Sequence, residues 1–212
     1  MTTTVAAAPT WRVVDRVVDL ARIYEDDVNV VILERPRPAA LGAWLDALAR
    51  AETSKQALAA EPEALEDGLA RLVATFPAGP ERDAFREDLA WLADVYAELL
   101  GAARVGLRLN VFGEDMCPRF HADQVLVRLI CTYAGPGTEF LDEADVDRGA
   151  LGARDGDALR PGGVVRRAPT FAVVLLKGGA WPDNDGKGAV HRSPPICAAG
   201  ERRVLLTIDG LA

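Results

Sequence analysis

The sequence predicts an α+β fold in which a helical first half packs on a β-sandwich or barrel formed by the second half. Two observations predict it. Apolar residues recur at helical spacing through most of residues 1–101, whereas from residue 104 they alternate with polar residues or form short apolar runs. Turns rich in Gly and Pro separate these runs, which is typical of sandwiches and barrels.

Three helices are expected in the first half. Pro38 opens the first, residues 53–76 form the second, and the third runs from Pro80 to a stop at Gly101. Before them, residues 28–33 (VNVVIL) predict a short strand. The apolar stripes of the helices indicate packing against a core rather than a binding site.

Four strands are expected in the second half. Residues 104–112 and 202–209 alternate apolar and polar side chains, while residues 124–133 and 170–179 are nearly continuous apolar runs. No linker rich in Pro, Gly or Ser separates the halves. We therefore expect a single domain over residues 1–212, with a helical layer at 1–101 and a β core at 104–212.

The net charge of −8 and the pI near 4.9 argue against a nucleic-acid partner, which needs a basic face. No run of about 20 apolar residues exists, so we expect no membrane span. The N-terminal residues MTTTVAAAPT do not form a convincing signal peptide. Three cysteines without paired spacing indicate a reduced, cytoplasmic chain.

The only two histidines both lie beside turns in the β-rich half. His121 and Asp123 project to the same side of an extended segment, so they offer a nitrogen and an oxygen to one metal ion. His191, some seventy residues later, would complete a two-His-one-carboxylate triad that leaves open positions on Fe(II). Cys117 stands four residues before His121, and a Cys/His/Asp/His set would suit zinc instead.

Four segments carry a family resemblance: NVFGEDMCPRFHAD, LICTYAGPGTEFL, VVLLKGGAW and AVHRSPPICAAGERRVLL. In order and spacing they resemble the Fe(II)/2-oxoglutarate dioxygenase superfamily, especially its prolyl-hydroxylase-like branch. The likeness covers about half the chain. It implies a double-stranded β-helix, a jelly-roll or cupin-like fold, with the N-terminal helices packed on one sheet. The strings CPRFHAD, TYAGPGTEFL and AVHRSPP within these segments also resemble a bacterial family known only as a domain of unknown function. Members of that family tend to accompany zinc-responsive metal-handling genes.

Carried over residue by residue, the resemblance makes His121, Asp123 and His191 iron ligands. Arg202 would pair with the distal carboxylate of 2-oxoglutarate. Arg203 is adjacent, and a strand turns only one of the two arginines inward, so which one faces the pocket stays open. A second 2-oxoglutarate contact is not assigned with certainty; the candidates are Tyr133 and Arg128.

Two functions follow from these features. The first is an oxygenase that binds Fe(II) and 2-oxoglutarate and acts on an unknown small-molecule or protein substrate. The second is a zinc-binding accessory or storage protein of metal homeostasis, for which Cys117 is the motivating residue. A structural relic that has lost its metal is a third reading. Trp181 is a candidate substrate contact or a tryptophan at a strand end, and the acidic residues 142–147 are a second metal site or, more simply, a solvated turn.

Overall fold

The computed structural model describes residues 8–51, 53–152 and 157–211. The prediction about a signal peptide depends on residues 1–7, which lie outside the described residues. Within the described ranges, no helix combines the length and the apolar character needed to cross a membrane. The single-domain organisation stays a prediction.

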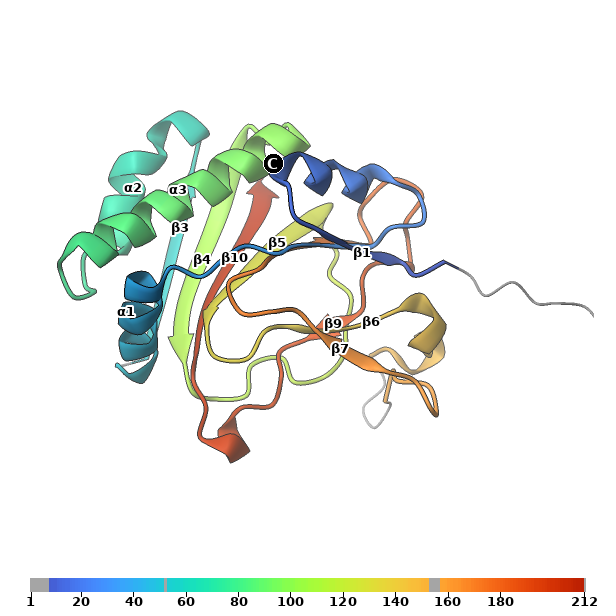
Figure 1. The fold of residues 1–212 in the computed structure, drawn as a ribbon. Helices are drawn as coiled ribbons and strands as arrows, with labels where there is room; N and C mark the ends of the chain where they lie inside the picture. Colours follow the sequence, from blue (N-terminus) through green and yellow to red (C-terminus); the bar gives the residue numbers. More distant parts are fainter. Residues whose placement is uncertain (1–7, 52, 153–156, 212) are drawn as a thin grey trace, which may run out of the picture.

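A seven-stranded sheet forms the centre of the fold, with the strand order β1-β2-β8-β5-β10-β4-β3 (Figure 1). All neighbouring strands are antiparallel except β1 and β2. The strands are β1 Trp11–Val14, β2 Val30–Leu33, β3 Ser54–Ala60, β4 Arg104–Phe112, β5 Val127–Ala134, β8 Val173–Lys177 and β10 Arg203–Leu211.

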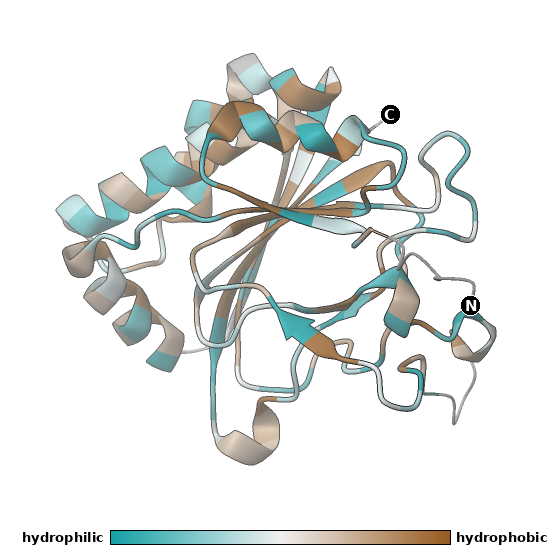
Figure 2. Cartoon of the chain, turned by 45° about the vertical axis from the view of Figure 1, so that its right-hand side comes forward, coloured by the Kyte–Doolittle hydropathy of each residue, from teal (hydrophilic) through white to brown (hydrophobic). Residues whose placement is uncertain are grey.

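Helices cover one face of this sheet, as Figure 1 shows. They are α1 Ala39–Arg50, α2 Leu65–Leu72, α3 Pro80–Leu100 and the 3-10 helix η1 Val17–Tyr24. Their apolar stripes join alternate residues of the strands in one large core. On β5 the residues that face the helices are Val127, Leu129, Cys131 and Tyr133. In Figure 2 the helices accordingly alternate between brown apolar and teal polar segments, while much of the central sheet is brown.

A second, three-stranded sheet lies toward the opposite face, in the order β7-β6-β9. Its strands are β6 Glu139–Leu141, β7 Val165–Arg167 and β9 His191–Arg192. Phe140 of β6 shares a smaller core with Ile130 and Val174 of the large sheet. Other strand residues on this face are polar, among them Arg128, Thr132 and Arg203. The two sheets therefore enclose a partly polar interior.

Most predicted elements are confirmed, including the strands within 28–33, 104–112, 124–133, 170–179 and 202–209 and the helix after Pro80. The prediction of a helix over 53–76 is wrong for its first part. Ser54–Ala60 is an edge strand, paired antiparallel with β4, and only Leu65–Leu72 is α-helical. Exposure alternates residue by residue along the strand, so Leu58 turns inward onto Gly68 while its neighbours face solvent.

Candidate metal centre

The two histidines lie directly opposite each other in an isolated antiparallel bridge. The His121 amide donates to the His191 carbonyl at 3.0 Å, and the His191 amide donates back at 2.9 Å. The imidazole rings lie on the same side, with centroids 4.5 Å apart. His191 belongs to β9, which pairs with β6 through Phe140. The second sheet thus fixes the position of both rings.

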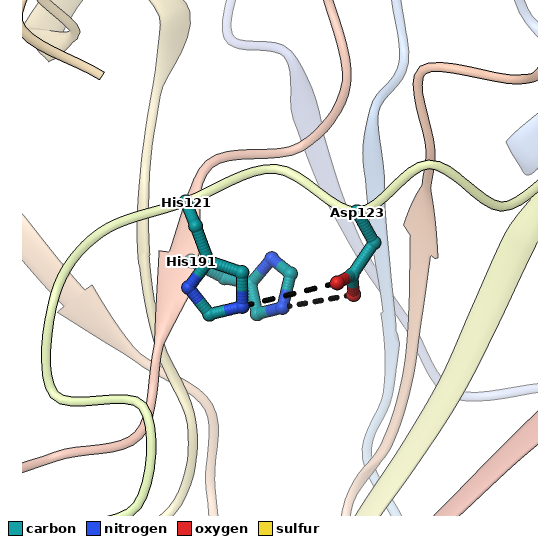
Figure 3. A group of neighbouring side chains, drawn as sticks. All are labelled: His121, Asp123 and His191. Carbon is teal, nitrogen blue, oxygen red and sulfur yellow. Dashed lines mark ion pairs between the residues drawn. The ribbon is translucent and has the colours of Figure 1, made fainter. Parts of the chain in front are cut away.

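Asp123 completes the triad from the loop before β5 (Figure 3). Its carboxylate lies 3.3 Å from His191 Nε2 and 3.8 Å from His121 Nε2. Backbone contacts hold the loop, because the Gly179 amide donates to the Asp123 carbonyl at 2.8 Å. A side chain at Gly178 would clash with the Val125 and Asp123 carbonyls, so this approach requires glycine.

Hydrogen bonds select the tautomer of each imidazole. Nδ1 of His121 lies 2.9 Å from the Arg119 carbonyl, and Nδ1 of His191 lies 3.1 Å from the Ala189 carbonyl. A carbonyl only accepts, so each Nδ1 carries the proton and each Nε2 presents a lone pair toward Asp123. Burial and the neighbouring His191 lower the pKa of His121, which favours the neutral, metal-binding form.

The triad fits a divalent metal ion. One ligand atom from each of the three residues lies within 4.8 Å of the other two, and among the described residues no further His, Cys, Asp or Glu joins this group. Two imidazoles and one carboxylate on one side leave further positions open, which suits Fe(II) and also catalytic zinc.

Asp123 is oriented by an arginine. Arg128 Nη1 donates to its Oδ2 at 2.6 Å, while Arg128 Nε and Nη2 donate to the two oxygens of Asp209 at 2.8 and 2.9 Å. Burial acts to raise the pKa of Asp123, but its close contact with the His191 imidazole and the charge of Arg128 outweigh burial and lower the pKa to about 2. Asp123 is therefore an anion at neutral pH.

A cavity of about 240 Å³ opens beside the two histidines. Ile130 and Leu205 give it apolar walls, and Thr138 and Ser193 contribute hydroxyl groups. The remaining lining residues are Arg108, Asn110, Met116, Cys117, His121, Arg128, His191 and Thr207.

Arg203 is buried behind the two hydroxyls. It donates to Ser193 Oγ and Thr132 Oγ1 at 2.9 Å each and to Thr138 Oγ1 at 3.2 Å. The side chain is 0% exposed, and its Nε has no hydrogen-bond partner among the residues that the structure describes. No carboxylate of the described residues lies within ion-pair distance of it. Burial, together with the charge of Arg167, lowers its pKa to about 10, so the group is still a cation at neutral pH.

The assignment of Arg202 to the site interior is corrected by this geometry. Arg202 donates to the carbonyls of Ala49 and Ala51 at the end of α1, on the side of the sheet that the helices cover, at 2.9 Å for Ala51. Arg203 is the inward residue because it begins the alternation that also turns Leu205 toward the cavity. Gly135, at a φ of 79°, lets the turn before β6 pack on the Arg202 carbonyl, where a side chain would clash.

The other predicted residues divide between the two faces of the sheet. Arg128 lines the cavity, but Tyr133 points to the helices and donates to Asp88 Oδ2 at 2.6 Å, so it does not face the cavity. Cys117 lines the cavity with a φ of 50° and is exposed, but it is outside the closely spaced ligand group. The sequence did not predict roles for Thr132, Thr138, Ser193 and Asp209. Only two of them stood in strings that gave any signal: Thr138 in the turn GPGT and Ser193 in HRS.

Trp181 and the acidic stretch lie elsewhere. Trp181 stacks edge-on against Tyr24, with ring centroids 5.1 Å apart, and does not line the cavity. Within 142–147, Asp145 pairs with Arg166, and Glu143 pairs with Arg148. Since these carboxylates already have cationic partners, the stretch fits a paired surface turn.

Solved structures with a similar fold include a rice dioxygenase for auxin oxidation. It is 17% identical, the match covers 92% of this chain and 78% of that chain, and the TM-score is 0.53, which shows a shared fold. A prolyl-4-hydroxylase from Pseudomonas putida is 12% identical over 92% and 97% of the two chains, with a TM-score of 0.46. The Fe(II)/α-ketoglutarate-dependent dioxygenase TqaL is 11% identical over 91% and 85%, with a TM-score of 0.49.

No curated protein matches the sequence. One family model does, and it covers residues 14–209, which include the triad, the inward arginine and all strands except most of β1 and the end of β10. The chain therefore belongs to the family described as "Protein of unknown function (DUF1826)".

Proposed function

We propose that this protein is an oxygenase that depends on Fe(II) and 2-oxoglutarate. The observation that carries the proposal is the position of Arg203, which is buried directly behind the Thr138 and Ser193 hydroxyls in the wall of the cavity that the histidines line. A buried guanidinium whose only side-chain partners are hydroxyl groups, with one nitrogen left unpaired, needs an anion. A dicarboxylate that reaches from the metal to Arg203 would supply it.

Each residue then has a definite role. His121, Asp123 and His191 would hold the metal, which supplies the activation of oxygen. Arg203 would pair its positive charge with the distal carboxylate of 2-oxoglutarate. Thr138 and Ser193 would orient that guanidinium and accept its remaining protons. Ile130 and Leu205 would exclude water from the carbon chain of the co-substrate.

The architecture supports the same proposal. We infer that the seven-stranded and three-stranded sheets are the two sides of a double-stranded β-helix, with the triad between them. The fold shared with the rice dioxygenase supports this inference. In this arrangement His191 comes from β9 of the second sheet, and His121 and Asp123 come from the loop between β4 and β5. Arg203 comes from β10 of the large sheet.

Zinc binding without oxygenase activity is the second candidate, and Cys117 favours it because its side chain lines the cavity beside His121. If this thiolate binds zinc, Cys117→Ser should lower the affinity for zinc tens-fold or more. The cobalt-substituted protein would also show a thiolate charge-transfer band. Its absence would remove Cys117 from the metal site.

The decisive experiment is turnover. Protein purified without oxygen is loaded with Fe(II) and given 2-oxoglutarate and air, and succinate is measured. Wild type is expected to form succinate slowly even without its substrate, and His191→Ala is expected to form none. Failure of 2-oxoglutarate to bind the iron-loaded wild type would rule out the oxygenase function and leave the zinc candidate.

A further inference from the structure

The cavity has a second polar end, away from Arg203, on strands β4 and β10. Arg108 and Asn110 of β4 and Thr207 of β10 line it. Arg108 and Thr207 are register partners, so their side chains are neighbours on one face of the sheet. The Thr207 hydroxyl is buried and has no hydrogen-bond partner among the described residues. This end therefore has unused hydrogen-bonding capacity.

The same end is cationic. Arg128 directs three nitrogens at Asp123 and Asp209 and has none to spare. Arg108 donates Nη2 to Asp209, its side chain is 46% exposed, and its Nε and Nη1 make no hydrogen bond within the described part of the chain. Asp209 thus divides one negative charge between two guanidinium groups. Among the described residues that line the cavity there is no Asp or Glu, although the whole chain carries a net charge of −8.

Formal charges show what remains after the co-substrate binds. A divalent metal and the 2-oxoglutarate dianion cancel each other. Arg128 and Arg203 add two positive charges, which Asp123 and Asp209 offset. Arg108 is left as one uncompensated cation at the cavity, and a cation in such a position favours an anionic ligand.

We propose that the substrate is a small monocarboxylic acid, and that Arg108 binds its carboxylate. The inference rests on the proposed function, because the metal and Arg203 are then occupied by 2-oxoglutarate. Asn110 and Thr207 are the neighbouring donors for the same carboxylate. Met116 offers an apolar surface for the carbon skeleton. A cavity of about 240 Å³ lies below the usual size of ligand pockets, which restricts the substrate to a small molecule.

The test compares acids with their uncharged amides. Phenylacetate with phenylacetamide, and propionate with propionamide, are titrated into iron(II)-loaded protein saturated with 2-oxoglutarate in the absence of oxygen. Binding is followed by ligand-observed NMR. Wild type is expected to bind the acid of at least one pair ten-fold or more tighter than the amide. Arg108→Gln should reduce that preference below three-fold, and Arg108→Lys should restore part of it.

Arg104→Gln is the matched control, since Arg104 is an exposed arginine at the start of the same strand and should keep the wild-type preference. Equal binding of acid and amide in both pairs, or an unchanged preference in Arg108→Gln, would overturn the inference. Calorimetry with 2-oxoglutarate separates the two proposals. If wild type does not bind 2-oxoglutarate, the oxygenase function fails. The acid–amide comparison is then made on metal-loaded Arg203→Gln, with and without the additional substitution Arg108→Gln. Loss of the preference for the acid when Arg108 is replaced still decides this inference.

Discussion

Arg202 and Arg203 are consecutive in sequence, but their side chains contact opposite sides of the large sheet. Nη2 of Arg202 donates to the Ala51 carbonyl after α1 at 2.9 Å, and Nη2 of Arg203 donates to the buried Thr132 hydroxyl at 2.9 Å. The pleat of β10 accounts for the difference, because successive side chains leave a strand in opposite directions. Two residues of identical chemistry are therefore natural controls for each other.

Arg203→Gln is expected to weaken the binding of 2-oxoglutarate by about 2–5 kcal/mol, because the substitution leaves the buried carboxylate of the co-substrate without its cation. Arg202→Gln removes a partly exposed contact with backbone carbonyls and should change the affinity by less than about 1 kcal/mol. Calorimetry on the anaerobic iron form measures both. A larger loss of 2-oxoglutarate affinity in Arg202→Gln than in Arg203→Gln would mean that Arg202, and not Arg203, binds the distal carboxylate.

Removal of either histidine should abolish tight metal binding, because the chain has no third imidazole to replace it. Elemental analysis of His121→Ala and His191→Ala, with circular dichroism to verify folding, measures this. Cys197→Ser is the control, since Cys197 is an exposed thiol that is not in the ligand group. Stoichiometric metal in both histidine variants would refute the site.

Arg128 is expected to act on the metal through Asp123. Its hydrogen bond of 2.6 Å to Oδ2 orients the carboxylate, and loss of such an orienting partner typically lowers metal affinity 10- to 100-fold. Arg128→Gln should show that loss in competition with a chelator of known affinity. Arg108→Gln is a close control, because Arg108 also pairs with Asp209 but does not contact Asp123. Equal effects of the two variants would mean that the shared Asp209, rather than the contact with Asp123, is responsible.

The triad was predictable from sequence because the three ligand residues stood in two short strings, one of them with the i, i+2 spacing of an extended chain. The inward arginine was not predictable to the residue. Both arginines precede the same apolar strand, and only its pairing with β4 and β5 sets which one turns inward.

The first half of the chain was harder to predict. Leu58 and Leu65 fit a helical stripe by spacing, but Ser54–Ala60 completes the edge of the sheet beside β4, and tertiary pairing outweighs the local pattern there. Tyr133 illustrates the same limit. Its strand was predicted correctly, yet whether a residue faces the helices or the cavity depends on parity, which a nearly continuous apolar run does not reveal.

The second sheet gives the last prediction, which concerns pH. Glu139 is 5% exposed and lies between Arg167 and Arg192, with contacts of 2.7 Å to each. Burial acts to raise the pKa of Glu139, but the two arginines outweigh it and hold the pKa below its ordinary value. The carboxyl is therefore more acidic in the folded protein than in the unfolded chain. Its ionised form stabilises the fold above the unfolded pKa of about 4.3, and this contribution is lost as the pH falls through the folded pKa.

Glu139→Gln should consequently lower the free energy of unfolding at pH 7, and its deficit relative to wild type should shrink steadily below about pH 4. Urea denaturation of both proteins between pH 7 and pH 3 measures the difference. Glu114→Gln is the control: Glu114 is exposed and lies 3.6 Å from Lys55, a surface pair of small energetic value, so its deficit should be near zero at every pH. A deficit for Glu139→Gln that stays constant down to pH 3 would mean that the side chain stabilises the β6–β9 pair by packing and not by charge. In that case the position of His191, one residue before Arg192, would not depend on the ionisation of Glu139.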